Sequence, residues 1–226
     1  MIKNNSFKLP NLILLGPPGA GKGSLASKLA SLYGYYQLST GDMFRSEIRN
    51  KSPLGLKIKS ILDSGAYVSD DITNELVEKT LLELQKQNKP FILDGYPRTL
   101  DQADFLKSLE AKNINIDQVI LLEITPEQII SRLEKRRICP NCKTIYHMQY
   151  NPPKDYIHCN NESCQNVEVI KRADDNPEII KNRIKIYEQQ TSMLINYYEK
   201  ANILIKLNSY RPIDEIVKDT SKELGI

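Results

Sequence analysis

The 226-residue sequence predicts an α/β fold, in which a five-stranded parallel sheet is flanked by helices. Three observations lead to this fold class. Short apolar runs alternate with segments of helical periodicity, as in chains that form parallel sheets. A glycine-rich loop joins the first apolar run to the first helical segment, which is the setting of a phosphate-binding loop. Two segments, 40–68 and 138–173, interrupt the alternation and are predicted to form small inserts on the core.

The composition is that of a globular protein whose charges nearly balance, with a formal net charge of +3. This balance gives no basic signature for nucleic acid, and no apolar run approaches the length of a membrane span. The start of the chain lacks the apolar stretch of a secretion signal. Residues before Pro10 are polar, and we expect them to form a short extension. These features favour a cytoplasmic protein.

The strongest motif is the loop 16–24, GPPGAGKGS, which follows the apolar run 11–15. Its glycines let successive backbone N–H groups turn inward, and the helix N-terminus that follows adds partial positive charge to the same anion site. Lys22 then brings a full charge to the terminal phosphates. The alternative is an ordinary glycine- and proline-rich turn. Gly23 stands where Ser or Thr usually ligates Mg²⁺, so the nearest hydroxyl belongs to Ser24.

The apolar pattern also places the other elements. Ser39 or Thr40 can cap one helix, and Thr125 with Pro126 can open another. We expect strands at 11–15, 35–39, 89–94, 118–123 and 203–207. We expect one helix to begin at residue 25 and another at residue 40. A short helix pair broken by Gly65 should occupy 52–71. Further helices are expected over 72–84, 125–137, 177–198 and 212–224.

A second motif, residues 89–99, places charged side chains after an apolar strand. Asp94 ends this strand, where a carboxylate can hold Mg²⁺ or its waters beside the phosphate loop. Arg98 follows a rigid Gly-x-Pro turn and offers a fork of donors to an anion. Taken alone, Asp94 could equally be a helix cap or a turn residue. Arg45 and Arg49 share one helix face, and for Arg49 a solvated cationic surface is the better interpretation.

All four cysteines lie in the insert 138–173, as the pairs Cys139/Cys142 and Cys159/Cys164. Four thiolates in two knuckles suit a tetrahedral, structural Zn²⁺. The metal would replace the apolar core that so short a segment lacks. Two disulfides are the alternative, with three possible pairings. A reducing cytoplasm favours zinc.

The fourth ligand is open, because the second pair is spaced C-x4-C. Glu162 stands at the shorter C-x2-C spacing and His158 adjoins Cys159, so either could replace a thiolate. Cys164 is favoured because thiolate is the softer donor. Otherwise we expect His147 and His158 to be solvated surface residues.

Four motifs together resemble the adenylate kinase family of nucleoside monophosphate kinases: GPPGAGKGS, STGDMFR at 39–45, DGYPRT at 94–99 and RADDN at 172–176. The resemblance covers nearly the whole chain and, with the cysteines, indicates the long-lid, zinc-bearing type. Ser24 in place of Thr and the C-x4-C spacing depart from the family pattern. The resemblance implies a P-loop NTPase core of residues 1–39, 69–137 and 174–226, a small helical NMP-binding insert at 40–68 and a zinc-bearing lid insert at 138–173.

The resemblance further implies reversible phosphoryl transfer from Mg²⁺-bound ATP to AMP, giving two ADP, by a monomer that binds neither nucleic acid nor membrane. The residues implied in catalysis are Lys22, Asp94, Arg98, Arg136, Arg172 and Arg183. Those implied for ATP are Gly19, Ala20, Gly21, Lys22, Gly23, Ser24, Arg132, Arg136, Tyr146 and Arg211. Those implied for AMP are Thr40, Arg45, Ala66, Tyr67, Val68, Gly95, Arg98, Gln102, Arg172 and Arg183.

Two alternatives differ in function. One is a kinase of other base preference, with GTP as donor or a pyrimidine monophosphate as acceptor. Thr40 and Gln102 argue against the pyrimidine option, since pyrimidine kinases of this kind carry Ala and Asn there, and the Gln102 amide suits an adenine edge. The other is a zinc-dependent nucleic-acid or partner-binding module with a vestigial phosphate loop. The small net charge and the full set of arginines argue against it.

Overall fold

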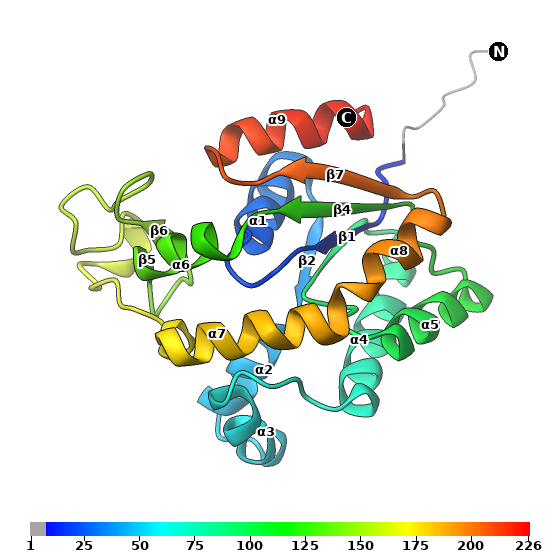
Figure 1. Ribbon diagram of the computed structural model, residues 1–226, viewed down its shortest axis with the longest axis horizontal. Coiled ribbons are helices and arrows are strands. Elements are labelled where there is room, and N and C mark those ends of the chain that lie inside the picture. Colours follow the sequence, from blue (N-terminus) through cyan, green and yellow to red (C-terminus); the bar gives the residue numbers. More distant parts are fainter. Residues whose placement is uncertain (1–7) are drawn as a thin grey trace.

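A computed structural model describes residues 8–226 (Figure 1), so the extension expected before Pro10 lies outside the described residues up to position 7. Five parallel strands form one sheet in the order β2-β3-β1-β4-β7. The strands are β1 (Leu12–Leu15), β2 (Tyr36–Ser39), β3 (Phe91–Asp94), β4 (Gln118–Glu123) and β7 (Leu204–Asn208). The predicted fold class is therefore confirmed.

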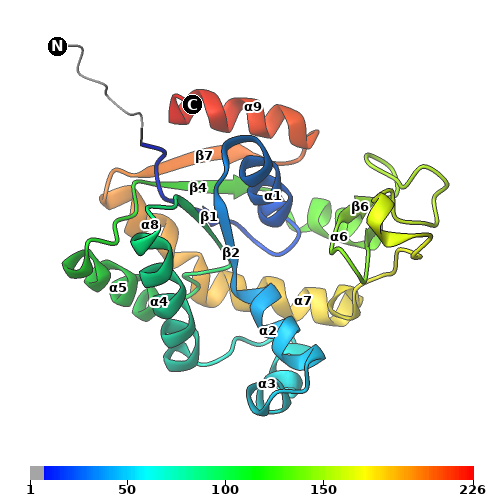
Figure 2. The ribbon, with the colours of Figure 1, turned by 180° about the vertical axis from the view of Figure 1, so that it is seen from behind.

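Both faces of this sheet are buried, as expected for parallel strands. Leu12 and Leu14 of β1 pack into the cluster under α1 (Lys22–Tyr33) and α9 (Ile213–Leu224). Ile13 and Leu15 point the other way, into the cluster under α4 (Asp70–Lys86), α5 (Leu100–Ser108) and α8 (Met193–Lys200). Figure 2 shows the two helical layers from behind. Both inserts follow strands that end at the carboxyl edge of the sheet, β2 and β4.

The first insert is a pair of short helices, α2 (Thr40–Arg49) and α3 (Pro53–Asp63), around a small core of Phe44, Ile58 and Val68. Ser39 caps α2 by accepting the N–H of Asp42. The helix pair predicted within 52–71 is wrong, because that segment holds α3 and only the first two residues of α4, and the partner of α3 is α2. Gly65, with φ of 79°, turns the chain out of α3 before α4 begins.

The second insert contains a hairpin of β5 (Arg136–Ile138) and β6 (Ile145–His147) and a short 3₁₀ turn, η2 (Glu162–Cys164). The helix predicted over 125–137 is too long, since α6 (Pro126–Glu134) ends before the hairpin. Arg136 pairs with His147 across the hairpin. Tertiary pairing here overrides the helix propensity of a Lys-Arg-Arg run.

The chain returns from the lid through a 3₁₀ turn, η3 (Ala173–Asp175), into α7 (Pro177–Ile186). The single helix predicted over 177–198 is interrupted by a π-helical turn, η4 (Tyr187–Thr191), before α8 begins. Helix α5 and the 3₁₀ turn η1 (Leu109–Lys112) were not predicted. Thr99 caps α5 by accepting the N–H of Gln102. None of the helices in residues 8–226 is long and apolar enough to cross a membrane.

Candidate active site and metal centre

The phosphate-binding loop connects β1 to α1 at the carboxyl edge of the sheet. Gly16 has φ of 137°, and a Cβ there would lie 2.6 Å from the carbonyl oxygen of Leu122, so only glycine fits. Gly19 and Ala20 lie in the loop, and Gly21 caps α1 with φ of 100°. An open loop at a helix N-terminus is a ready site for an anion.

Lys22 is the first residue of α1, and its ammonium group donates to the carbonyl oxygens of Gly16 and, at 2.9 Å, Pro17. Burial lowers the pKa of Lys22 to about 7, Asp94 opposes this shift, and Arg98, Arg183 and Arg136 add to it. The loop carbonyls therefore hold the amine in a site crowded by other cations.

Asp94 ends β3, the neighbour of β1 in the sheet, in register with Leu14. Its carboxylate accepts a hydrogen bond from Nε2 of Gln37 at 3.3 Å. A Cβ at Gly23 would lie 3.2 Å from Oδ2 of Asp94, so glycine at that position leaves space beside the carboxylate. Burial raises the pKa of Asp94, and Lys22 opposes the shift. Gly23 therefore lies beside the buried Asp94 carboxylate, with no side chain of its own to contact it.

Three arginines, which we call the lid arginines, gather on two aspartates where the lid joins the core. Nε of Arg136 lies 2.8 Å from Oδ2 of Asp175, and Nη2 of Arg172 lies 2.6 Å from Oδ2 of Asp174. Nη1 of Arg183, on α7, lies 3.1 Å from the same Asp174 oxygen. Residues far apart in the sequence are therefore brought to one charged cluster.

Burial and mutual repulsion shape the charges of this cluster. Burial lowers the pKa of Arg183 to about 10, and Arg172 and Arg136 repel it further, while Asp174 opposes the shift. Although burial acts in the opposite sense, Arg172 and Arg183 hold the pKa of Asp174 well below its usual range. Arg136 and Arg183 also lower the pKa of Lys22. Positive charge is thus concentrated beside the phosphate loop, as a polyphosphate site requires.

Arg98 lies on the other side of the cleft, after the cis Tyr96–Pro97 peptide bond. Its Nε donates to the carbonyl oxygen of Gly95 at 2.7 Å, and its guanidinium lies 4.7 Å from the centroid of the Tyr67 ring. The Thr40 hydroxyl donates to the same Gly95 oxygen at 2.9 Å. Gly16, Lys22, Gly95, Arg98 and Arg183 line one cleft between the sheet edge and α7.

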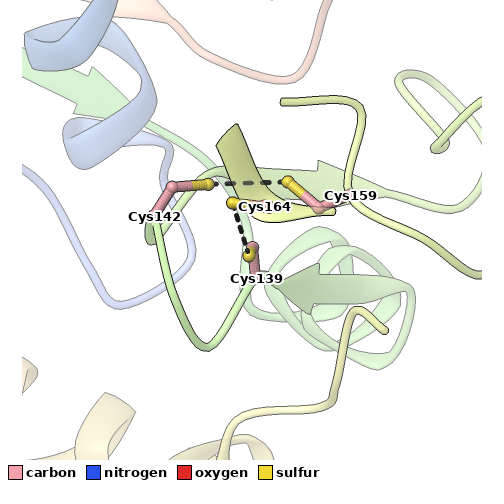
Figure 3. Close-up of side chains that lie close together, drawn as sticks. All are labelled: Cys139, Cys142, Cys159 and Cys164. Atoms are coloured by element: carbon pink, nitrogen blue, oxygen red, sulfur yellow. Dashed lines mark hydrogen bonds between the residues drawn. The ribbon is translucent and has the colours of Figure 1, made fainter. Parts of the chain in front are cut away.

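The four cysteines gather in the lid, with their sulfur atoms all within 4.8 Å of one another (Figure 3). The Sγ–Sγ distance is 3.7 Å for Cys139 and Cys164 and 3.5 Å for Cys142 and Cys159. Both distances exclude disulfides, which need about 2 Å. Four sulfurs at about 2.3 Å from one zinc ion stand about 3.8 Å apart in a tetrahedron. The cluster therefore fits a single metal ion.

The alternative ligands lie outside this cluster. His158 is held by Asp155, with 2.5 Å between Nδ1 and Oδ2. Glu162 is exposed at the start of η2. His147 is half-buried and stacks on Tyr150 at 4.6 Å between ring centroids, so the prediction of a solvated surface residue is wrong for it. Cys164 completes the four-thiol set, as the favoured prediction had it.

Comparisons with known proteins agree with this geometry. Residues 14–203 match the family model described as adenylate kinase. The chain is 46% identical over 214 residues to an adenylate kinase of Mycoplasma mobile, covering 95% of this chain and 97% of that one. It is 42% identical over 219 residues to one of Mycoplasmopsis pulmonis, covering 96% and 100%, and 43% identical over 210 residues to one of Methanosarcina barkeri, covering 92% and 95%. The chain belongs to the adenylate kinase family.

As a member of the adenylate kinase family, the chain is a phosphotransferase that converts ATP and AMP to two ADP. Its four-cysteine cluster is in keeping with the long-lid type that the sequence indicated. The family also accounts for the joint presence of a phosphate loop, a terminal strand aspartate and convergent arginines in one cleft.

Several residues predicted to contact nucleotide have protein partners in this adenylate kinase fold. Gln102 is only 1% exposed, and its Nε2 donates to Asp70 at 2.7 Å while its Oε1 accepts the N–H of Arg98. Tyr146 is buried in the lid, where its hydroxyl lies 3.2 Å from Sγ of Cys159. These side chains are not free in the cleft as it stands.

Other predicted residues contact neighbouring protein groups. Nη1 of Arg132 donates to the carbonyl oxygen of Ala20 at 3.2 Å, and Nη2 donates to that of Ser209 at 2.7 Å, so this side chain braces the phosphate loop against the end of β7. Arg45 pairs with Asp42 at 2.5 Å. Arg211 pairs with Asp219. Val68 is buried in the core of the first insert, and Ala66, two residues earlier, is half-buried. Ser24 lies in the first turn of α1.

Sequence reasoning missed several groups that the adenylate kinase fold brings to the cleft. Gln37, within β2, contacts Asp94, and nothing in its sequence context marks it. Asp174 and Asp175 were quoted in the RADDN motif but not recognised as partners of the lid arginines. Thr191, on the unpredicted π turn, donates to the carbonyl oxygen of Arg98. A helical periodicity search cannot find a π turn, because it assumes a constant 3.6-residue period.

Proposed function

We propose that ATP and AMP meet in the cleft at the carboxyl edge of the sheet. The ATP phosphates bind the loop 16–24 and Lys22, and the AMP phosphate binds Arg98, with Arg45 beside it. The gathering of Lys22, Arg98 and Arg183 around one cleft at the phosphate loop carries this proposal. Two highly charged nucleotides can be held in line only where so much positive charge is fixed in place.

In this mechanism the protein positions the reactants and neutralises charge. The lid arginines exchange Asp174 and Asp175 for phosphate oxygens when nucleotides bind. The attacking AMP phosphate oxygen is already ionised, so no general base is required. Closure of the two inserts excludes water, whose attack would waste ATP; adenylate kinases are a familiar example of such closing lids.

Magnesium would be held by Asp94, directly or through its waters, with the carboxylate oriented by Gln37. When bound with ATP, the ion supplies further neutralisation of phosphate charge. The space beside Gly23 leaves the Asp94 carboxylate accessible from α1.

The acceptor base is adenine in our proposal. Nε2 of Gln102 donates one of its two hydrogens to Asp70, and Oε1 of Gln102 accepts the N–H of Arg98 with one of its two lone pairs. It keeps one donor and one acceptor, the pair that an adenine edge requires. Thr40 supports the same choice from the neighbouring helix start, where its hydroxyl is bonded to Gly95. Ala66, Tyr67 and Val68 would lie along the acceptor base, and Arg132, Tyr146 and Arg211 near the donor base.

The metal in the lid is Zn²⁺ in our proposal, held by Cys139, Cys142, Cys159 and Cys164 in a closed structural site. Four reduced thiols suit a reducing compartment such as the cytoplasm. We further propose that the enzyme works as a monomer, since all the groups assigned to both nucleotides come from one chain.

The test is ADP formation from ATP with AMP, GMP, CMP and UMP in turn, with Mg²⁺ present and omitted. We expect Mg²⁺-dependent ADP formation with AMP far above the other acceptors. A preference for CMP or UMP would overturn the base assignment. Absence of turnover with every acceptor, in folded and zinc-loaded protein, would favour the binding-module interpretation.

A further inference from the structure

The π turn η4 lies between α7, which carries Arg183, and α8, both of which are labelled in Figure 1. The N–H of Ser192 donates to the carbonyl oxygen of Tyr187 at 2.9 Å, five residues earlier, which is the π pattern. One extra residue in a helix rotates everything after it by about 100°. Thr191 is consequently buried, at 6% exposure, against the loop that follows β3.

The Thr191 hydroxyl links two parts of the acceptor site. It donates to the carbonyl oxygen of Arg98 at 2.8 Å. Because a hydroxyl has one proton, the Tyr67 hydroxyl, 3.0 Å away, must be the donor in the second contact. The Tyr67 ring lies 4.7 Å from the Arg98 guanidinium. One side chain therefore holds both the backbone of Arg98 and the ring on which its guanidinium rests.

We propose that Thr191 is a positioning residue for Arg98, and that the π turn exists in this chain to place it there. This proposal rests on the proposed function, in which Arg98 grips the AMP phosphate. Thr191 lines the cleft, but the hydrogen bonds of its hydroxyl go to Arg98 and Tyr67. Both of its partners belong to the acceptor half of the cleft, and its hydroxyl makes no contact with the phosphate loop, so its effect falls on AMP and not on ATP.

The main variant is Thr191→Val, which keeps the shape of the side chain and removes the hydroxyl. It leaves the Arg98 carbonyl and the Tyr67 hydroxyl without their partner. Two such losses predict a rise of about tenfold in the KM for AMP, with the KM for ATP within about twofold of wild type. Calorimetric titration with AMP should show the same rise in Kd without any turnover.

Three further variants separate positioning from general damage. Thr191→Ser keeps the hydroxyl and should return the KM for AMP to within about twofold of wild type. Tyr67→Phe removes one of the two bonds but keeps the ring, so it should raise that KM by about threefold. Ser192→Ala is the matched control, because the Ser192 hydroxyl bonds only to Glu188 of its own helix. It should change neither KM.

An unchanged KM for AMP in Thr191→Val, or an equal rise in both KM values, overturns the positioning role while the proposed function stands. The same holds if Thr191→Ser behaves like Thr191→Val. If Thr191→Val does not fold, an unchanged KM for AMP in Tyr67→Phe overturns it instead. Failure of the wild-type enzyme to bind AMP or to form ADP overturns the proposed function, and the role of Thr191 with it.

Discussion

Replacing Cys164 with serine should release the lid metal and unfold the lid, whereas replacing Glu162 with glutamine should do neither. Cys164 is buried with its sulfur 3.7 Å from that of Cys139, and Glu162 is exposed on the same 3₁₀ turn. The two positions are two residues apart, so Glu162→Gln is a matched control for the same turn. The pair also decides the ligand that the sequence left open.

The size of the effect follows from how little else holds the lid together. Its core cluster has seven members, and four of them are cysteines; the others are Tyr146, Val167 and Val169. Full burial of three such side chains contributes at most about 1.5–3 kcal/mol each. Ordering the backbone of this segment costs about 1–2 kcal/mol per residue over several tens of residues. Metal binding of about 10–16 kcal/mol, as in zinc-finger peptides, is then decisive.

Two assays measure this prediction. Metal analysis after dialysis should give about one zinc ion per chain for wild type and Glu162→Gln, and less than about one tenth for Cys164→Ser. Limited proteolysis should cut Cys164→Ser within 138–173 and leave the other two proteins intact there. Retention of zinc by Cys164→Ser, together with its loss in Glu162→Gln, would refute the ligand assignment. A zinc-free lid that still resists protease would refute the stabilising role of the metal.

Three other predictions concern the cleft. Burial lowers the pKa of Lys22 to about 7, so in the free protein this amine is largely uncharged at pH 8 and charged at pH 6. ATP binding should therefore take up about one proton at pH 8 and almost none at pH 6. Calorimetry in two buffers of different ionisation enthalpy measures the uptake, and equal uptake at both pH values would contradict the prediction. Gly23→Ala places a Cβ 3.2 Å from Oδ2 of Asp94. This variant should lower kcat by about tenfold with little change in Tm. An unchanged kcat would show that the space between Gly23 and Asp94 is not needed. Asp70→Asn frees the Gln102 amide to flip, so the ratio of kcat/KM for AMP to that for IMP should fall by about tenfold. Asp71→Asn removes the neighbouring charge at the same helix start and is the control. An equal fall of the ratio in Asp71→Asn would point to helix electrostatics instead.

The sequence was sufficient for the elements that depend on local pattern. Apolar runs placed all five strands of the sheet. The central strands β1, β3 and β4 are almost continuously apolar and buried, and the edge strands β2 and β7 are only partly buried. Glycine spacing located the phosphate loop because the backbone there needs left-handed conformations, as at Gly16. The cysteine pairs predicted the metal cluster because ligand spacing is a local property.

Features that depend on tertiary contacts were not predictable in this way. Arg136 was placed at a helix end, but its partner strand β6 draws it into a hairpin. The carboxylate of Asp70, thirty-two positions earlier, accepts a hydrogen bond from the Gln102 amide, and no local pattern indicates this contact. The π turn that buries Thr191 leaves no signal in apolar periodicity. Each case depends on a residue distant in the sequence, which only the folded chain brings near.

The most direct test of the whole account is the fate of the γ-phosphate of ATP. The enzyme is incubated with Mg²⁺, AMP and ATP labelled at that phosphate, and the products are separated. If the lid arginines and closed inserts deliver the phosphoryl group to AMP and exclude water, the label appears in ADP and free phosphate stays at background. Label released chiefly as free phosphate would contradict a cleft built for transfer between two nucleotides.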